Sequence, residues 1–217
     1  MNPADIYYAT RSPFKKAELD IIEREIRVTV DVDRDVPIGE VCRFIISPVS
    51  TDEPLEIDLE QMVRHKVRSA YRSLLMPCIV EHAGLILESG EATSFPGGLT
   101  QPMWDALSAE GFLSRTGASG NKAIARAVIG YCDGMSVRTF VGETEGYIAD
   151  RPRGRREFYW DTIFCPDGDF GGLTYAEIAE AKDGLRTKVN VSQSMKAIRQ
   201  LASHIAKNGH GQMFGTA

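Results

Sequence analysis

CIVEHAGLIL, residues 78–87, is an apolar run with a glutamate and a histidine side by side in its middle. Its length and its content of Ile, Val and Leu are typical of a strand buried at the centre of a sheet. An isolated charge is costly to bury, so a charge in such a run must be paired, bound to a metal or neutralised. Glu81 and His82 are therefore the first candidates for a functional site.

Helical and strand patterns alternate on both sides of this run, without repeats or a linker-like segment. Upstream, the pattern predicts strands at 5–10, 26–32 and 41–49, and helices at 12–26 and 58–75. The first helix is expected to have Ser12 as its N-cap and Pro13 as its first residue. Downstream, the pattern predicts a meander of strands at 121–132 and 136–149 and a last helix capped by Ser192. This order indicates a single α/β domain over residues 1–217.

The composition is that of a globular protein large enough to bury a substantial core: 217 residues, of which 43% are hydrophobic and 25% charged. A net charge of -5 argues against binding to a nucleic acid polymer or to an anionic membrane through bulk electrostatics. No apolar run approaches the roughly 18 residues that span a bilayer, and residues 1–10 lack the pattern of a signal peptide. A cytoplasmic location is the expectation.

The first polar group beyond this scaffold is ATRSPFKK, residues 9–16, where a strand ends and a helix begins. Exposed amides at a helix start, the hydroxyls of Thr10 and Ser12 and the ammonium of Lys15 together make an anion site. The alternative is a capped surface helix with solvated lysines, because lysines usually lie on wet surfaces.

Two further groups have chemistry that a nucleotide would use. Glu56 precedes a predicted helix and Glu81 lies in the strand after it, so both carboxylates can meet at one end of the sheet and bind Mg²⁺. The aromatic residues Phe158 and Trp160 beside Asp161 can stack on a nucleobase and hydrogen-bond its edge. The alternatives are a solvated loop carboxylate at Glu56 and aromatic residues in the core.

The order and spacing of these groups resemble the inosine triphosphate pyrophosphatase family over nearly the whole chain. The family's Thr-x-Asn-x-x-Lys is similar to residues 10–15, and its Leu-Pro-Glu-Ile to residues 54–57. Its acidic strand Glu/Asp-Asp-Ser/Thr-Gly-Leu resembles residues 81–85, and its Phe-Gly-Tyr/Trp-Asp-Pro-x-Phe resembles residues 158–164. Its closing lysine and its Ser-His-Arg fall on Lys188 and on residues 192–194.

The resemblance implies a long, curved mixed sheet flanked by helices, folded into two lobes around a central nucleotide cleft, and a homodimer. The implied reaction is Mg²⁺-dependent hydrolysis of a nucleoside triphosphate to the monophosphate and pyrophosphate. The implied roles are phosphate binding by Thr10, Ser12 and Lys15, metal binding by Glu56 and Glu81, and base binding by Phe158, Trp160, Asp161, Lys188, Ser192 and Gln193.

The departures from the family pattern matter as much as the matches. His82 stands where the family has its second acidic residue; a neutral imidazole can act as general base, but it supplies no negative charge. Gln193 and Ser194 replace the His-Arg pair that reads a 6-oxo base, so the base preference is open. Three alternatives follow: an enzyme for inosine or xanthosine triphosphate, the same reaction on another base, and a nucleotide-binding regulator with impaired catalysis.

Overall fold

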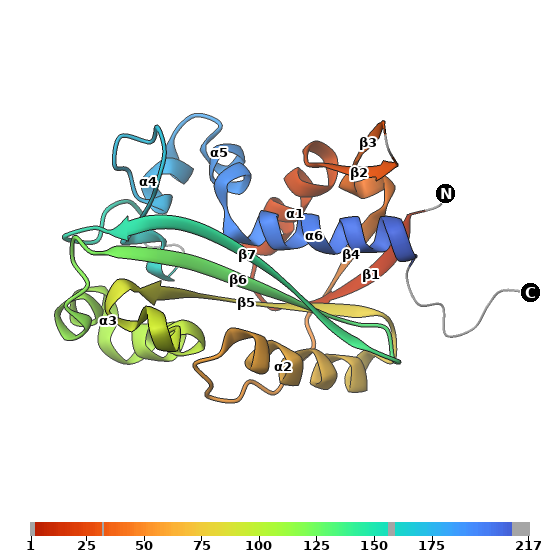
Figure 1. Ribbon diagram of the computed structural model, residues 1–217, viewed down its shortest axis with the longest axis horizontal. Coiled ribbons are helices and arrows are strands. Elements are labelled where there is room, and N and C mark those ends of the chain that lie inside the picture. Colours follow the sequence, from red (N-terminus) through yellow and green to blue (C-terminus); the bar gives the residue numbers. More distant parts are fainter. Residues whose placement is uncertain (1–2, 32, 156–158, 210–217) are drawn as a thin grey trace, which may run out of the picture.

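The computed structural model describes residues 3–31, 33–155 and 159–209. A curled, six-stranded mixed sheet runs through the molecule in the order β4-β1-β5-β6-β7-β8, and β2 and β3 form a separate two-stranded hairpin (Figure 1). The strands are β1 Ala4–Ala9, β2 Arg27–Asp31, β3 Arg34–Pro37, β4 Cys42–Ser47, β5 Cys78–Leu87, β6 Lys122–Cys132, β7 Val137–Ile148 and β8 Phe164–Pro166. The predicted fold class, a curved mixed sheet flanked by helices, is confirmed.

The quoted stretch CIVEHAGLIL is strand β5, the place where the sheet changes from parallel to antiparallel. It pairs in parallel with β1, with Tyr8 opposite Ile79, and antiparallel with β6 along its whole length. Because successive side chains of a strand point to opposite faces, Glu81 and His82 face different sides of the sheet. Two neighbouring residues therefore reach two different sets of elements.

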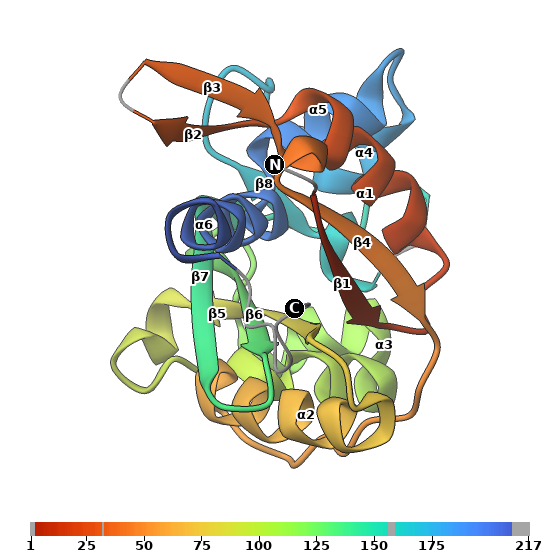
Figure 2. The ribbon, with the colours of Figure 1, turned by 90° about the vertical axis from the view of Figure 1, so that its right-hand side faces the viewer.

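Helices cover both faces of the sheet (Figures 1 and 2). Helices α2 and α3 lie below it in Figure 1, and α1, α4, α5 and α6 lie above it. Their bounds are α1 Phe14–Glu25, α2 Leu59–Leu74, α3 Thr100–Thr116, α4 Tyr175–Glu180, α5 Gly184–Val191 and α6 Gln193–Asn208. Short 3₁₀ turns lie at η1 Ile38–Glu40, η2 Glu88–Thr93, η3 Gly97–Leu99 and η4 Tyr159–Thr162.

Helices α2 and α6 form where the sequence predicts them, because each has a polar cap and one apolar face. The carboxylate of Asp58 accepts from the backbone N–H groups of Glu60 and Gln61 at the start of α2. Ser192 accepts from the N–H of Met195 at the start of α6, as predicted. The buried face of α6 consists of Met195, Ala197, Ile198, Leu201, Ala202 and Ile205.

The start of α6 lies against β7 at a glycine. A Cβ atom on Gly142 would come within 2.0 Å of the carbonyl oxygen of Gln193, so only a residue without a side chain permits this approach. The approach fixes the position of Gln193 and Ser194 next to the sheet.

The start of α1 differs from the prediction. The helix begins at Phe14 with Pro13 at the N-cap position, and no side chain caps it. Ser12 instead donates its backbone N–H to Oγ1 of Thr10 at 3.1 Å. The interpretation of Ser12 as a cap was wrong because the turn closes on the hydroxyl of Thr10, three residues before the proline.

Helix α3 contains a kink that the sequence did not predict. Ser108 has φ 59° and ψ 177°, a conformation that residues with a side chain rarely adopt. The helix therefore consists of two segments that meet at this residue.

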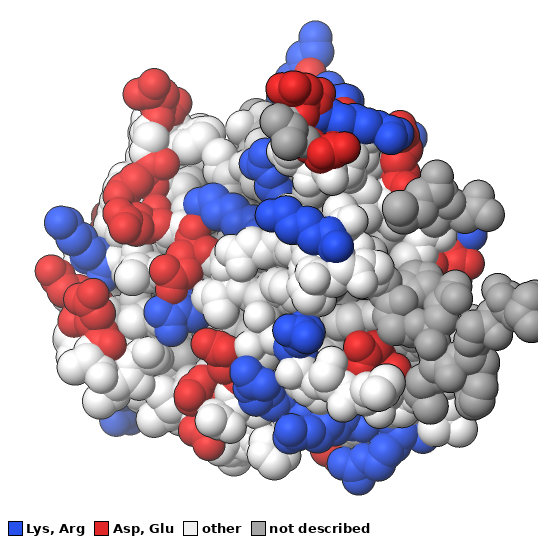
Figure 3. Space-filling model, turned by 45° about the vertical axis from the view of Figure 1, so that its right-hand side comes forward, with Lys and Arg blue, Asp and Glu red and all other residues white. Residues whose placement is uncertain are grey.

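Acidic and basic side chains are interspersed on the face shown in Figure 3. Within the described ranges, no helix has both the length and the apolar character needed to cross a bilayer.

Candidate active site

A cavity of about 1060 Å³ is bordered by elements from both faces of the sheet. Its walls come from the β1–α1 turn, the loop before α2, helices α2 and α3, strand β5 and the turn η4. Thr10, Ser12, Lys15, Glu81, His82 and Trp160, all predicted from the sequence, border it. The structure thus brings together residues from both halves of the chain.

Glu81 is the most densely bonded carboxylate of this cavity. Its Oε2 accepts from the hydroxyl of Tyr8 at 2.5 Å, and its Oε1 accepts from Lys15 Nζ at 3.0 Å and from the hydroxyl of Ser194 at 2.6 Å. Burial by itself would raise the pKa of Glu81, but Lys15 and the two hydroxyl hydrogen bonds outweigh it and lower the pKa. The carboxylate is therefore ionised in the folded protein at neutral pH.

A chain of alternating charges continues from Glu81 through the upper half of the molecule. Lys15 also contacts Glu18 at 3.0 Å, Glu18 lies 3.6 Å from Lys188, and Lys188 pairs with Asp161. Burial would lower the pKa of Lys15, yet Glu18 and Glu81 raise it well above its ordinary value. Lys15 therefore stays charged, and the chain of ion pairs joins β5, α1, α5 and η4.

Asp161 behaves differently from Glu81 although it also pairs with a lysine. Burial raises its pKa, and this effect exceeds the opposing effect of Lys188. A second cavity of about 390 Å³, bordered by Glu18, Asp161, Lys188 and Arg155, opens at this end of the charge chain.

His82 faces the other side of the sheet, toward the loop before α2. Its Nδ1 lies 3.8 Å from Oε2 of Glu53, and Lys66 donates to Oε1 of Glu53 at 2.7 Å and to the backbone carbonyl of Glu81 at 3.2 Å. Nε2 is buried without a well-formed hydrogen bond, although an interaction with the backbone of Gly98 raises the pKa of the ring. Burial and the charge of Lys66 lower the pKa of His82 to about 4, so the imidazole is neutral at pH 7.

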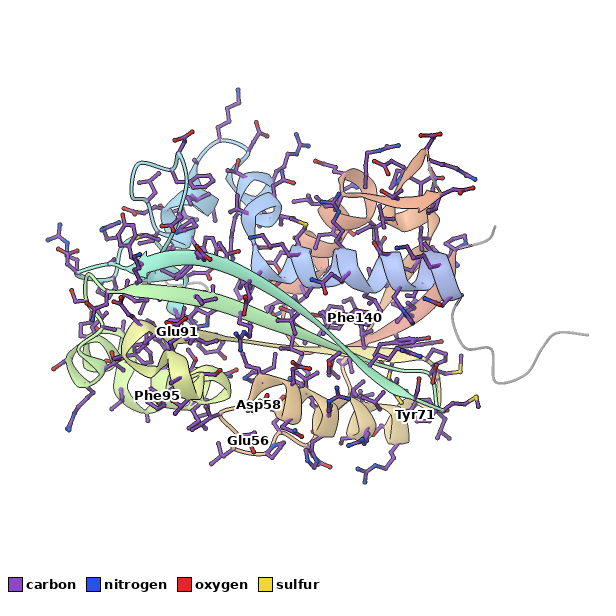
Figure 4. The ribbon with its side chains drawn as sticks, viewed as in Figure 1. Glu56, Asp58, Tyr71, Glu91, Phe95 and Phe140 are labelled. Atoms are coloured by element: carbon purple, nitrogen blue, oxygen red, sulfur yellow. The ribbon has the colours of Figure 1, made fainter. Side chains whose placement is uncertain are left out.

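Glu56 is not brought to Glu81. Its Oε1 accepts from the backbone N–H groups of Ile57 at 2.9 Å and Asp58 at 3.4 Å, and it lies in the loop before α2, outside the residues that border the cavity (Figure 4). Glu53, three residues earlier, borders the cavity instead. The carboxylates that border the cavity are therefore Glu53, Glu81 and Asp105, and Glu53 is the one beside His82.

These carboxylates form a donor set that suits a hard cation shared with phosphate groups. Mg²⁺ commonly uses one or two protein carboxylates and takes its remaining ligands from water and substrate. Among the described residues, no group of three or more His, Cys, Asp or Glu side chains is arranged to hold a metal ion alone. Glu53 and Glu81 both border the cavity and have the oxygen donors that a cation arriving with the substrate would use.

The predicted base-binding residues have mixed positions. Phe158 lies outside the described residues. Trp160 is only 2% exposed and packs against Phe164 and Tyr175, with ring centroids 5.9 and 6.4 Å away. The segment that begins at Tyr159 is a 3₁₀ turn.

The side chains at the start of α6 also bond to other groups of the protein. Ser192 caps the helix, and Oε1 of Gln193 accepts from the hydroxyl of Tyr175 at 3.2 Å. Both residues are buried, and neither borders the large cavity. Ser194, at the position of the family's arginine, binds Glu81.

Sequence reasoning missed five residues of this site: Tyr8, Glu18, Glu53, Lys66 and Ser194. Tyr8 could have been found from the alternation of side chains along the predicted strand at 5–10. Ser194 could have been found from its position two residues after the predicted cap, Ser192. No sequence pattern indicates Glu53, because it lies in a loop, and neither the strand period nor the helix period predicts the path of a loop.

Fold and site together define an α/β protein whose cleft combines lysines, carboxylates and aromatic rings. The chain belongs to the Ham1 family, whose sequence profile matches residues 6–204. This confirms the resemblance to inosine triphosphate pyrophosphatases, because relatives bearing such names are similar to it.

A dITP/XTP pyrophosphatase of Methanopyrus kandleri is 34% identical over 171 residues, which cover 77% of this chain and 86% of the relative. An inosine triphosphate pyrophosphatase of Candida albicans is 29% identical over 171 residues, 77% of this chain and 80% of that protein. A solved HAM1 protein of Coxiella burnetii shares the fold with a TM-score of 0.66 and 21% identity, covering 93% of this chain and 98% of that one.

Proposed function

We propose that this protein hydrolyses a nucleoside triphosphate, by default a non-standard purine such as inosine or xanthosine triphosphate, to the monophosphate and pyrophosphate. The observation that carries the proposal is Glu81, an ionised carboxylate at the cavity wall, held by Lys15 beside the β1–α1 turn. The names of the similar relatives support the same reaction.

In this reaction a water oxygen attacks the α-phosphorus, and the anhydride bond between the α- and β-phosphates breaks. The products are the nucleoside monophosphate and pyrophosphate, and the water gives up its proton. Lys15 and the hydroxyls of Thr10 and Ser12 hold phosphate oxygens, and the ammonium of Lys15 offsets negative charge. Tyr8 and Ser194 keep Glu81 oriented.

His82 is the proposed proton acceptor, because its imidazole is neutral at pH 7 and borders the cavity. A pKa near 4 makes it a weak base, and Glu53 beside Nδ1 supplies the compensating negative charge. Glu81, with Glu53 as the second carboxylate, would hold Mg²⁺, which withdraws charge from the phosphates when bound. The sequence predicted Glu56 for this second place, and comparing variants of both carboxylates decides between them.

Pyrophosphate release from a panel of inosine, xanthosine, guanosine, adenosine and pyrimidine triphosphates, with and without Mg²⁺, tests the function. We expect turnover that needs Mg²⁺ and that falls by about a hundredfold or more in Lys15→Met and Glu81→Gln. Glu53→Gln should weaken Mg²⁺ binding in calorimetry with a bound non-hydrolysable nucleotide, and Glu56→Gln should not. Binding of nucleotide without pyrophosphate release would instead identify a regulator.

The same panel tests the alternative that another base is the substrate. That alternative is favoured by Gln193, whose amide is bonded to Tyr175, and by Ser194, whose hydroxyl is bonded to Glu81. Cleavage of inosine and xanthosine triphosphates alone would exclude it. The homodimer remains a prediction from the resemblance, and the cytoplasmic location remains a prediction from the sequence; the dimer is checked by light scattering.

A further inference from the structure

A hydrogen bond joins the turn η4 to helix α3 at the wall of the cavity. Nε2 of Gln101 donates to the hydroxyl of Tyr159 at 2.9 Å, and both residues border the cavity. The family pattern has glycine at the position of Tyr159, so this bond is a property of this chain.

The backbone of Tyr159 is fixed by the buried residues that follow it. Trp160, Asp161 and Thr162 are each at most 4% exposed, whereas Tyr159 is 38% exposed. The hydroxyl of Thr162 donates to the carbonyl of Tyr159 at 3.4 Å. With Gln101 at its hydroxyl end, the tyrosine is held at both ends while one part of its surface stays open.

Among the residues that the structure describes, Tyr159 is one of few aromatic rings that this cavity can offer to a ligand. Tyr8 and Trp160 also border it but are 1% and 2% exposed, so almost none of their surface is available. Phe14 is 40% exposed, and Trp104, whose centroid lies 5.5 Å from that of Phe112, is partly covered. A planar ligand in the cavity therefore meets Tyr159 more readily than Trp160.

The groups around the tyrosine hydroxyl are the donating amide of Gln101 and the nearby carboxylates of Asp105 and Glu53. Burial, Asp105 and Glu53 raise the pKa of Tyr159, so the phenol keeps its proton. Asp105 and Gln101 both border the cavity beside it. The surroundings thus combine an open ring with polar groups that can bond the edge of a base.

We infer that Tyr159 is a specificity-determining residue whose ring, held in place by Gln101, forms the wall against which the nucleobase packs. The inference rests on the proposed function for the presence of a nucleotide in this cavity. Base stacking on an aromatic side chain contributes substantially to affinity, and a purine offers a larger face than a pyrimidine. Tyr159 therefore favours purine over pyrimidine nucleotides, whatever group reads the base edge.

The test is equilibrium binding of non-hydrolysable inosine and uridine triphosphate analogues by calorimetry, which does not depend on turnover. Tyr159→Leu keeps bulk but removes the ring, and should lower the inosine-to-uridine affinity ratio about tenfold. Tyr159→Phe and Gln101→Leu remove the same hydrogen bond, so each should weaken inosine nucleotide binding by a similar factor, about threefold, with no further loss in the double variant.

Tyr71→Leu is the control, because Tyr71 lies toward the far end of α2 from α3 and outside the cavity lining (Figure 4). Its affinity ratio should equal that of the parent. A ratio that stays within about twofold in Tyr159→Leu overturns the inference, while the proposed function stands if pyrophosphate is still released. If Tyr159→Leu changes the affinity ratio but the parent protein releases no pyrophosphate, the inference is supported and the proposed reaction is excluded. Absence of nucleotide binding by the parent overturns both.

Discussion

Among single residues, the site depends on the partners that hydrogen-bond to its buried charges. Glu81 has three side-chain donors, and each donor comes from a different element: Tyr8 from β1, Lys15 from α1 and Ser194 from α6. Removal of a partner leaves a buried polar group with fewer bonds, which costs more than the net gain from forming the bond.

Tyr8→Phe should therefore destabilise the protein by about 1–3 kcal/mol and lower turnover, because one oxygen of Glu81 loses its hydroxyl donor. Tyr7→Phe, on the neighbouring residue of the same strand, is the matched control and should stay within about 0.5 kcal/mol. Urea unfolding of the two variants measures the difference, and equal losses would show that the hydroxyl bond to Glu81 is not the cause.

His82 makes stability depend on pH in a definite direction. Its pKa is about 4 in the folded protein, below the ordinary 6.5 of an unfolded chain, so stability is full above pH 6.5 and falls as pH drops toward 4. The loss should reach roughly 3 kcal/mol, at about 1.4 kcal/mol per pH unit. His82→Asn should remove this contribution, and His65→Asn, at an exposed position of α2, should retain it. The two variants are compared by denaturant unfolding between pH 7 and 4.5; parallel curves would contradict the assignment.

At the scale of elements, sequence periodicity predicted most of the strands and the long helices α2 and α6. These elements have one apolar face or a continuous apolar run, and their caps are local. The start of α1, the kink in α3 and the turn η4 were not predicted, because each depends on neighbours distant in sequence. Trp160 illustrates this: beside Asp161 its ring indicated base stacking, but the contacts with Phe164 and Tyr175 bury it.

The kink in α3 gives a prediction with opposite signs at two serines of the same helix. Ser108→Gly should stabilise the protein by about 1 kcal/mol, because glycine adopts φ 59° and ψ 177° without the strain of a side chain. Ser114→Gly, at an exposed position of α3, should destabilise it by up to about 1 kcal/mol through lost helix propensity. Thermal unfolding measures both, and destabilisation by Ser108→Gly would show that the serine is not strained.

At the scale of the whole molecule, the charge chain from Glu81 through Lys15, Glu18 and Lys188 to Asp161 connects the central strand to the elements above the sheet. The sequence predicted four of these five residues for separate roles in phosphate, metal and base binding. It could not predict that they bond to one another, because that depends on the packing of α1 against α5.

Lys188→Met should destabilise the protein by about 3–5 kcal/mol, because it leaves the buried carboxylate of Asp161 without its lysine. The double variant Lys188→Met with Asp161→Asn should recover much of this loss, since no buried charge then lacks a partner. Lys182→Met, at an exposed position, should change stability by less than about 0.5 kcal/mol. Urea unfolding of the three proteins checks this, and a double variant as unstable as the single one would contradict it.

Glu18 has one further consequence, since it contacts both Lys15 and Lys188. The unliganded protein carries its own counter-anion in the place where an incoming phosphate seeks a lysine. If Lys15 binds phosphate as proposed, nucleotide binding exchanges one anion for another at Lys15 and does not neutralise a free cation. Fewer dissolved ions are released in such an exchange, so added salt should weaken nucleotide binding less than it weakens binding to solvent-exposed lysines.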